Sequence, residues 1–170
     1  MDKILKSKTI KTPLGQMVAV GDDEALYLLE FTERKALTKQ LERLKRLTKA
    51  EIVPGTAKSL EQIETELTHY FAGNLKTFKT PIKLLGTPFQ KAVWNELKKI
   101  PYGKTKSYRE IAEQIGKPTA FRAVALANSS NQLALIVACH RVINANGALG
   151  GYAAGLKCKQ WLLDLERSGN

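Results

Sequence analysis

Hydrophobic and polar residues alternate over the first thirty positions of the chain and then recur at helical spacing. An alternating segment at residues 8–12 and apolar runs at residues 16–20 and 25–31 are separated by turn-forming residues at 13–15 and 21–24, which predicts a meander of three strands. Four leucines then recur every three or four residues, as in an amphipathic helix, at Leu37, Leu41, Leu44 and Leu47. We expect Thr32 to cap this helix and residues 52–55 to end it as a loop.

A second helix is predicted to open at Ser59, because Ser-Leu-Glu-Gln is the pattern of a capping box. Its apolar residues share one face, and residues 75–85 then indicate a strand and a linker. His69 lies in this helix without a second His or Cys at ligand spacing, so a surface or capping role is favoured over a metal site. Residues 1–82 are therefore predicted to form a small α/β support domain.

Residues 83–170 are predicted to form a second, mostly helical domain. Capping boxes open helices at Thr87 and Ser107, and Thr119 is expected to cap a helix over residues 120–128. The last two of these helices are short and are joined by a turn containing Gly116, which is the pattern of a helix-turn-helix.

The second helix of this pair is rich in small residues and carries one charge, Arg122. One face of such a helix must pack against its neighbours, and the other is narrow enough to approach a DNA groove closely. It lacks the Asn, Gln and multiple Arg residues that read base edges in the major groove. The pattern therefore indicates recognition of DNA damage or structure rather than of sequence.

Composition agrees with a nucleic-acid partner. The 170 residues carry a net charge of +11, of which residues 1–85 contribute +4 and residues 86–170 contribute +7. A basic surface attracts polyanions, although a solvated basic surface without such a partner has the same charge. Two cysteines outside any C-x-x-C motif, no signal peptide and no membrane-length apolar run favour a soluble, cytoplasmic protein without a bound metal.

Candidate chemistry is concentrated at Cys139 and His140. The apolar run over residues 133–138 predicts a buried strand or turn that delivers both side chains, and Asn146-Gly147 predicts a tight turn after them. Positive neighbours favour the thiolate, and His can take or return its proton. This stretch alone fits a nucleophile and a buried structural cysteine equally well.

The C-terminal region adds a glycine-rich loop and a helix. Residues 147–155 lack the context of a dinucleotide or S-adenosylmethionine site, so no cofactor is predicted. The helix over residues 157–166 is expected to turn Trp161, Leu162 and Leu165 inward, with Cys158 at or near the surface. Glu166 either orients an imidazole or faces solvent.

In order along the chain, these residues resemble the O6-alkylguanine-DNA alkyltransferases, also called methylated-DNA–protein-cysteine methyltransferases. The match covers essentially all of residues 86–166. It rests on Thr87-Pro-Phe-Gln90 with Val93-Trp94, Ile100-Pro-Tyr-Gly103 with Thr105, Ser107-Tyr108, Ile111-Ala112, Ile115-Gly116, Arg122-Ala-Val124, Cys139-His-Arg-Val-Ile143 and Gly151-Tyr152. The resemblance implies a ribonuclease H-like α/β domain followed by a winged-helix-like domain with a helix-turn-helix.

The resemblance also implies a DNA repair activity. Cys139 would accept the alkyl group of O6-alkylguanine as a permanent thioether, one turnover per molecule. His140 would activate the thiol through a water, Glu166 would orient His140, and Asn131 would help fix the site. No cofactor or metal is implied, and the partner would be double-stranded DNA containing O6-alkylguanine, bound by a monomer.

Further roles follow for residues that touch DNA or the flipped base. Tyr108 would crowd the 3′ phosphate, help rotate the nucleotide and donate to N3 of the base, and Arg122 would occupy the vacated stack. Helix residues expected against DNA are Thr119, Ala120, Phe121 and Ala125. Backbone groups around Cys139, Val142 and Ala153 would read the guanine edge, and Tyr152 would wall the pocket.

Several residues depart from the family pattern. Ala138 replaces the usual Pro before the cysteine, and Ser129-Ser130 and Gln132 lack the usual Gly and Pro. Phe121 stands where a small residue is usual, and Ala153-Ala154 replace a small polar residue and Gly. We expect these departures to alter the rate, the lesion range or the affinity, but not the class of reaction.

Three alternative functions fit the residues less well than alkyl transfer. A non-catalytic alkylated-base binding protein, of the alkyltransferase-like type, would lack the acceptor cysteine that is present here. A helix-turn-helix regulator with a redox-sensing cysteine would need a dimer interface and a base-reading helix. A Cys-His hydrolase would leave the DNA-directed features unexplained.

Overall fold

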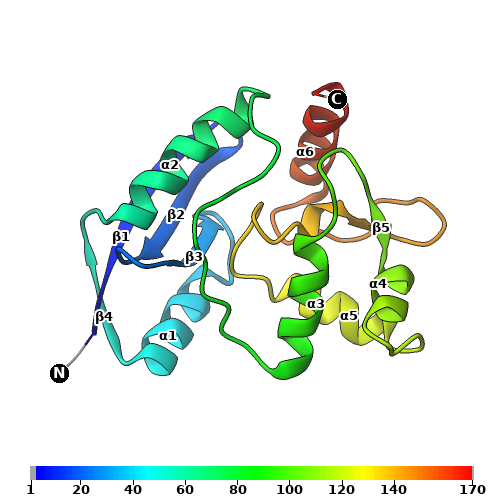
Figure 1. The fold of residues 1–170 in the computed structure, drawn as a ribbon, viewed down its shortest axis with the longest axis horizontal. Coiled ribbons are helices and arrows are strands. Elements are labelled where there is room, and N and C mark those ends of the chain that lie inside the picture. The colour runs from blue at the N-terminus through cyan, green and yellow to red at the C-terminus, as the bar shows by residue number, and fades with distance from the viewer. Residues whose placement is uncertain (1–2, 170) are drawn as a thin grey trace. The chain divides into compact units, whose positions relative to one another are not determined.

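A computed structural model describes residues 3–169, which form two compact units divided between Leu85 and Gly86 (Figure 1). The first unit is built on a four-stranded sheet, and the second is mostly helical. Each unit has its own buried core. The predicted class, an α/β domain followed by a helical domain with a helix-turn-helix, is confirmed.

The sheet of the first unit has the order β3-β2-β1-β4. Antiparallel pairing joins β1 (Lys3–Thr12), β2 (Gly15–Gly21) and β3 (Leu26–Phe31), so the predicted meander is confirmed. The loop predicted at residues 52–55 is wrong, because β4 (Ala50–Pro54) pairs in parallel with β1. That pairing joins segments more than forty residues apart in sequence, so local turn-forming residues did not indicate it.

Two helices cover the sheet. Leu44 of α1 (Leu37–Thr48) packs with Leu5, Val20 and Leu28, while α2 (Lys58–Phe71) lies along β1 and β2 (Figure 1). Both predicted N-caps are wrong: α1 begins after Ala36 and α2 after Ala57, and neither N-cap residue makes a side-chain bond. The start of α2 is capped instead by a residue distant in sequence, because Asp23 Oδ1 accepts from Lys58 N at 2.9 Å.

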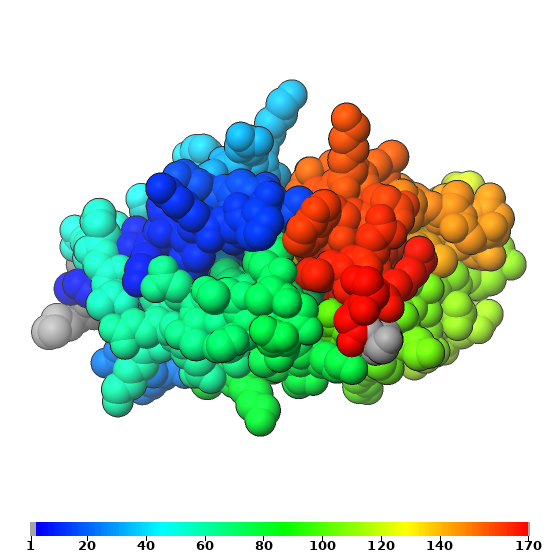
Figure 2. All heavy atoms as spheres, turned by 90° about the horizontal axis from the view of Figure 1, so that it is seen from above, coloured from blue at the N-terminus to red at the C-terminus, as the bar shows by residue number. Residues whose placement is uncertain are grey.

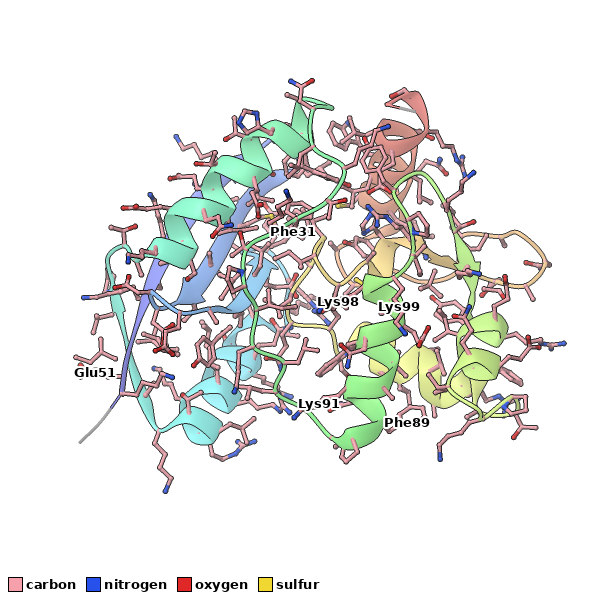
Figure 3. The ribbon with its side chains drawn as sticks, viewed as in Figure 1. Phe31, Glu51, Phe89, Lys91, Lys98 and Lys99 are labelled. Atoms are coloured by element: carbon pink, nitrogen blue, oxygen red, sulfur yellow. The ribbon has the colours of Figure 1, made fainter. Side chains whose placement is uncertain are left out.

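The edge strand β3 is covered by the segment that leads to the second unit. Leu26 donates its backbone N–H to Pro81 O at 2.8 Å and accepts from Lys83 N at 2.9 Å. All six residues of β3 are buried, and Phe31 closes the strand (Figure 3). The strand predicted within residues 75–85 is reduced to this one bridge, which protects a sheet edge from pairing with other chains.

The second unit begins with α3 (Pro88–Lys98), which opens with the predicted capping box at Thr87. Lys91 and Lys98 of this helix and Lys99, which follows it, are exposed (Figure 3), whereas Val93, Trp94 and Leu97 are buried. The remaining elements are β5 (Lys106–Ser107), α4 (Tyr108–Gln114), α5 (Phe121–Ser129), the 3-10 turn η1 (Cys139–Arg141), β6 (Val142–Ile143) and α6 (Leu156–Ser168).

Helices α4 and α5 form the predicted helix-turn-helix. The capping box at Ser107 is confirmed, with Glu110 N donating to Ser107 Oγ at 3.0 Å and Ser107 N to Glu110 Oε1 at 3.0 Å. The cap predicted at Thr119 is wrong, because Ala120 is the N-cap of α5 and makes no side-chain bond. Gly116 has φ +76° in the turn, a conformation that favours glycine.

Trp94 anchors α5 to α3. Its buried Nε1 donates to Ala127 O, near the end of α5, at 2.8 Å. Val124 and Ala127 are buried on the same helix, while Arg122 and Ala123 are exposed. The predicted division of α5 into a packed face and an open face is confirmed. The hydrogen bond from Trp94 fixes α5 against α3, and with it the position of the open face.

Replacing Trp94 with Phe tests this anchor. The substitution removes the indole donor from Ala127 O, which keeps only the longer bond from Ser130 N at 3.2 Å, so we expect the free energy of unfolding to fall by about 0.5–1.5 kcal/mol in urea titrations. Trp161→Phe on α6, where the indole is 37% exposed, is the matched control. Equal losses in the two variants would show that the buried hydrogen bond contributes nothing of its own.

Candidate functional site

A tight turn, rather than a strand, delivers Cys139. Residues 133–138 form a turn with one bridge between Ala134 and Val137, which is the second of the two predicted forms. Buried Leu135 has φ +73°, and Val137 N donates to Leu133 O at 3.0 Å. Because a branched side chain rarely adopts positive φ, the surrounding core must hold this turn in place.

Asn131 connects this turn to the thiol. Its Nδ2 donates to Val137 O at 2.9 Å and to Cys139 Sγ at 3.2 Å, and its Oδ1 accepts from Leu133 N at 2.9 Å. The amide is buried, so its orientation is fixed by these three bonds. An N–H aimed at sulfur favours the thiolate over the thiol. Asn131 therefore both positions and polarises the Cys139 side chain.

His140, Arg141 and Glu166 form a buried cluster beside Cys139. His140 Nε2 lies 2.7 Å from Glu166 Oε2. Arg141 donates from Nε to Oε1 at 2.8 Å and from a terminal nitrogen to Oε2 at 3.0 Å. Of the two interpretations of Glu166 left open by the sequence, the one in which it orients an imidazole matches this geometry.

Burial decides the protonation of His140. Complete burial lowers the pKa of the imidazole, and the nearby Glu166 carboxylate opposes this only in part. A neutral ring next to a carboxylate places its proton on Nε2, so Nδ1 carries a lone pair. Nδ1 is buried and makes no hydrogen bond within the protein. The ring is therefore prepared to accept a proton at that atom.

Glu166 stays ionised although it is completely buried. Burial raises the pKa of its carboxyl group, but hydrogen bonds from His140 and Arg141 outweigh burial and hold the pKa well below its usual range. Arg141 also donates to Ile100 O at 2.7 Å, so the guanidinium is itself fixed. Sequence reasoning treated Arg141 only as a positive neighbour and missed this structural role.

Lys159 is a second site residue that sequence reasoning missed. Its side chain is fully buried, and Nζ donates to Val142 O at 2.5 Å, Leu149 O at 2.5 Å and Gly151 O at 3.1 Å. Burial lowers its pKa to about 8, partly offset by the nearby Cys139 thiolate. Lys159 thus ties the loop after β6 to α6.

The helical spacing of α6 could have indicated from the sequence that Lys159 is buried. Lys159, Leu162 and Glu166 share a face at intervals of three and four, and all three are buried. The prediction that Trp161 turns inward is wrong, because that residue lies off this face and is 37% exposed. Leu165 is partly buried, and Cys158 is partly exposed as expected.

The small sheet of the second unit brings Tyr108 to the site. Ser107 pairs with Ile143, so the residues that follow, Tyr108 and Asn144, lie side by side. Burial, and then the nearby Cys139 thiolate, raise the pKa of the Tyr108 phenol. At neutral pH Tyr108 is therefore a hydrogen-bond donor near the sulfur.

The other predicted pocket residues lie in the segments that Lys159 holds. Val142 is buried and its carbonyl accepts from Lys159, whereas Tyr152 is half-buried and Ala153 is exposed. Ala138 has φ −79°, close to the angle that a proline ring imposes. The backbone before the thiol therefore adopts the proline-like conformation without proline.

The residues predicted to contact DNA gather around the start of α5. Thr119, Phe121 and Arg122 are exposed, while Ala120 and Ala125 are half-buried. Asn128 O accepts from Asn131 N at 3.3 Å at the other end of the helix, and Ser130 ends it at φ −87°. No positive φ is needed there, which explains why glycine is dispensable at Ser129-Ser130.

Neither a metal site nor a membrane helix is found in the described part of the chain. Among residues 3–169 no group of three or more His, Cys, Asp or Glu side chains could hold a metal ion. Within the same residues no helix is long and apolar enough to cross a bilayer.

The reactive groups of the site are a polarised thiol, a neutral base and a phenolic hydrogen-bond donor.

Two family models together match nearly the whole chain. The model described as "6-O-methylguanine DNA methyltransferase, ribonuclease-like domain" matches residues 5–84. The model described as "6-O-methylguanine DNA methyltransferase, DNA binding domain" matches residues 88–168. The predicted fold of each half agrees with these descriptions.

The names of similar proteins agree with these two family models. A methylated-DNA–protein-cysteine methyltransferase of Methanosarcina acetivorans is 44% identical over 158 residues, covering 93% of this chain and 96% of the relative. One from Mycolicibacterium paratuberculosis is 43% identical and covers 96% of this chain and 93% of the relative. The crystal structure of Mycobacterium tuberculosis OGT in complex with DNA has a TM-score of 0.84 at 41% identity, covering 98% and 94% of the two chains.

Replacing Glu166 with Gln tests the buried cluster. Arg141 would lose its counter-charge inside the unit, so we expect the free energy of unfolding to fall by about 3 kcal/mol or more. Because folding lowers the pKa of Glu166, its contribution is complete above the unfolded value and is lost as pH falls toward the folded one. The acid side of the wild-type stability profile should therefore be steeper than that of the variant.

The control is Glu113→Gln, at an exposed position of α4. Urea titrations at a series of pH values give both quantities. A loss in Glu166→Gln no larger than in the control would contradict the structural role of the carboxylate.

Proposed function

The chain belongs to the 6-O-methylguanine DNA methyltransferase family, and on that premise we propose that it repairs double-stranded DNA by transferring the alkyl group of O6-alkylguanine to Cys139. The observation that carries the proposal is the contact of Asn131 Nδ2 with Cys139 Sγ at 3.2 Å, beside the His140–Glu166 pair at 2.7 Å. A buried structural cysteine requires neither a hydrogen-bond donor nor a neutral base.

The transfer balances without a cofactor. The sulfur of Cys139 attacks the alkyl carbon, a C–S bond forms, and the bond from that carbon to O6 breaks with its electron pair going to the purine. His140 Nδ1 accepts the thiol proton through a water molecule. Tyr108, whose pKa is raised, donates a hydrogen bond to N3 of the leaving purine. The proton that His140 took from the thiol returns through water to the purine, which departs as neutral guanine.

In-line attack requires the target base to leave the duplex. Cys139 is only 7% exposed and cannot reach a carbon inside a base stack. Exposed Arg122 on α5 would fill the space that the base vacates, with Thr119, Ala120, Phe121 and Ala125 alongside the groove. The DNA complex of the mycobacterial relative supports binding of DNA by this chain.

The reaction consumes the protein. A thioether at Cys139 has no leaving group comparable to the purine, so each molecule acts once. A non-catalytic lesion binder is disfavoured, because it gives no role to a polarised thiol and a neutral base. We further propose that the protein acts as a monomer in the cytoplasm, where its thiol stays reduced, since every site residue named above comes from one unit of one chain.

Intact-mass measurement tests the transfer. After incubation with duplex DNA containing O6-methylguanine, we expect the mass of one methyl group to be added per chain, and none in Cys139→Ala. Cys158→Ala is the matched control and should still gain the methyl group. Binding of the duplex without any gain in mass would favour the lesion-binder alternative.

Arg122→Ala tests the entry of the base. The Arg122 side chain is needed only to fill the space left when a base is taken from the stack. The variant should therefore repair methylated duplex at least about tenfold more slowly. It should react normally with free O6-benzylguanine. Arg167→Ala, an exposed charge at the end of α6, is the control. Equal losses of rate on the duplex and on the free base would show that Arg122 does not act by filling the vacated stack.

A further inference from the structure

The positive charge of the first unit is concentrated in one short segment. Residues 33–49, which comprise α1 and the turns that flank it, contain seven basic and two acidic residues, a net charge of +5. The rest of residues 1–85 therefore carries a net charge of −1. None of the residues assigned to alkyl transfer lies in this segment, so its charge has no role there.

The two helices of this unit carry opposite charges. On α2 the net charge is −2, because one lysine is outnumbered by three glutamates. Residues of β2 alternate between the two faces of the sheet, so Val20 packs toward α1 while buried Ala19 faces α2. A surface that serves solubility alone mixes both signs, whereas separated signs create a field that attracts a charged partner.

Five cations of the segment are exposed, and among residues 3–169 none of them forms an ion pair. They are Lys35, Lys39, Lys45, Arg46 and Lys49. The single acidic residue of α1 is Glu42. Arg43 differs from the five, because it donates to Leu85 O at 3.1 Å. The charge of the five cations is therefore available to a partner.

Packing holds these cations on the outer side of α1. Leu44 packs with Leu5 and Val20 in the core of the unit. Lys39 and Arg46 are seven positions apart, about two helical turns, so both project away from the side of Leu44. In the space-filling view, the light-blue atoms of the turn that leads into α1 stand out from the surface of their unit (Figure 2). The basic face is therefore fixed by the core and exposed to solvent.

The chemistry of this face fits the backbone of duplex DNA. Helix α1 has 12 residues and is about 18 Å long, and over that length a duplex presents about ten phosphate charges. Residues 33–49 contain no aromatic side chain on which the bases of a single strand could stack. The one glutamine of the segment, Gln40, is buried, so no amide is offered to base edges.

A membrane surface fits this helix less well. An amphipathic helix binds at a lipid interface by burying an apolar face among the lipids. The apolar face of α1 is turned to the sheet, and of its leucines only Leu47, at 48%, is largely exposed. The cations of α1 therefore lack the apolar partner surface that lipid binding needs.

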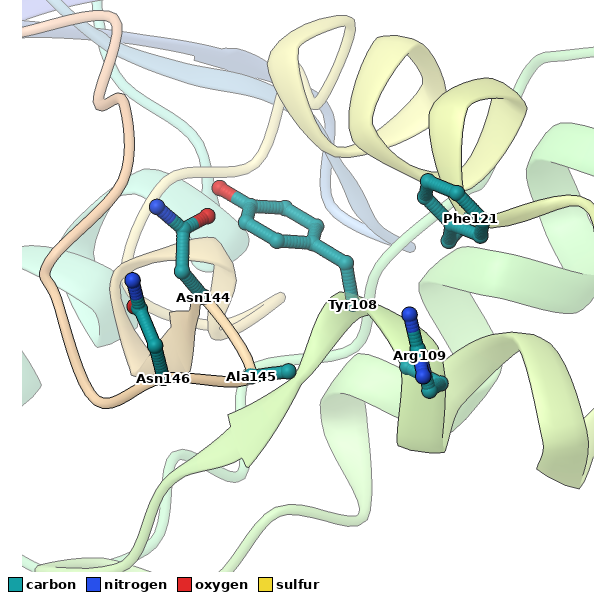
Figure 4. A pocket seen from close by; sticks show the side chains of 6 residues that line it. All are labelled: Tyr108, Arg109, Phe121, Asn144, Ala145 and Asn146. Atoms are coloured by element: carbon teal, nitrogen blue, oxygen red, sulfur yellow. The ribbon is translucent and has the colours of Figure 1, made fainter.

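The helix-turn-helix itself offers few cations to phosphates. Residues 108–129 contain three basic and two acidic residues, a net charge of +1. One of the three, Arg109, lines a pocket beside Tyr108, with its guanidinium carbon 5.7 Å from the centre of the Phe121 ring (Figure 4). Because phosphate contacts supply essentially all of the affinity for undamaged DNA, cations outside this helix pair must provide most of it.

We infer that the outer face of α1 is a second binding surface for duplex DNA, which contacts the phosphate backbone through Lys35, Lys39, Lys45, Arg46 and Lys49. The inference rests on the proposed function and extends it to the first unit. Phosphate contacts carry no sequence information, so this surface binds damaged and undamaged duplex alike. It keeps the protein on DNA between lesions, while recognition of the lesion belongs to the second unit.

Binding of an undamaged duplex at a series of salt concentrations tests this surface. The triple variant Lys39→Gln, Lys45→Gln, Arg46→Gln should bind roughly tenfold more weakly at moderate salt. The slope of log affinity against log salt concentration should fall by about 2.7, which is the loss of three phosphate contacts.

The matched control replaces three exposed lysines elsewhere in the same unit. The triple variant Lys11→Gln, Lys58→Gln, Lys79→Gln makes the same change in net charge and should keep the wild-type slope. Equal slopes in the two triple variants would overturn the inference. Both should react with free O6-benzylguanine at the wild-type rate, because the thiol site lies in the second unit.

An added charge tests the surface in the opposite direction. Glu42→Lys places a sixth cation among the five, so it should tighten binding of the duplex and raise the slope by about 0.9. Glu61→Lys, at an exposed position of α2, makes the same change in net charge and should leave the slope unchanged. Loss of folding cannot tighten binding, so this pair decides the question even if the triple variant fails to fold. No gain in Glu42→Lys beyond that in Glu61→Lys would contradict the surface.

Vesicles containing phosphatidylserine separate DNA from a membrane as the partner. If the α1 triple variant lost binding to the vesicles but kept the wild-type salt slope on the duplex, the surface would belong to a membrane and the inference would fail.

Failure of the transfer itself is a separate outcome. If the wild-type protein gained no methyl group from a duplex containing O6-methylguanine, the proposed function would fail, whatever the salt slopes. If it gained the group and the two triple variants had equal slopes, only the α1 surface would fail.

Discussion

One buried carboxylate organises the chemistry of the second unit. Glu166 accepts from His140 and from two nitrogens of Arg141, and it is completely buried. An ionised group without such donors would be far too costly to bury. The contact with His140 decides which ring nitrogen keeps its proton, and therefore which one can act as a base. The position and the tautomer of the base therefore depend on the same interaction.

The reactive thiol is held by side chains that bind backbone carbonyls. Asn131 binds Val137 O and the sulfur, Lys159 binds one carbonyl of β6 and two of the loop after it, and Arg141 binds Ile100 O. None of these segments is a long helix or strand, so the usual ladder of backbone hydrogen bonds cannot fix them. Buried polar side chains replace that ladder, and this explains why a site built from turns can hold a fixed geometry.

Most departures from the family pattern leave the backbone conformation of the site unchanged. Ala138 reaches a proline-like φ of −79°, and Arg141 N bonds to its carbonyl at 3.0 Å. Ser130 closes α5 without a left-handed residue. Phe121 is the exception, because it adds a ring that contacts Arg109 and lines a pocket. What distinguishes this chain is therefore expected at the DNA-facing surface rather than at the thiol.

The sequence by itself determined the elements with strong local signals. The meander, the capping boxes at Thr87 and Ser107, and the helix-turn-helix depend on alternation, side-chain caps and turn residues within a few positions of one another. The order of motifs around Cys139 was also sufficient to indicate the family. Local signals failed where partners distant in sequence set an element's limits, as at α2, whose first N–H binds Asp23, and at β4, which pairs with β1.

Only the tertiary structure decided the ionic and polar contacts of the site. From the sequence, Glu166 could equally face water, and Lys159 and Arg141 had no assigned roles. Their partners lie between 8 and 41 positions away along the chain, and no spacing rule connects them. The energy of a buried charge depends on donors that only the folded chain brings within hydrogen-bond distance, so its state could not be known before those donors were placed.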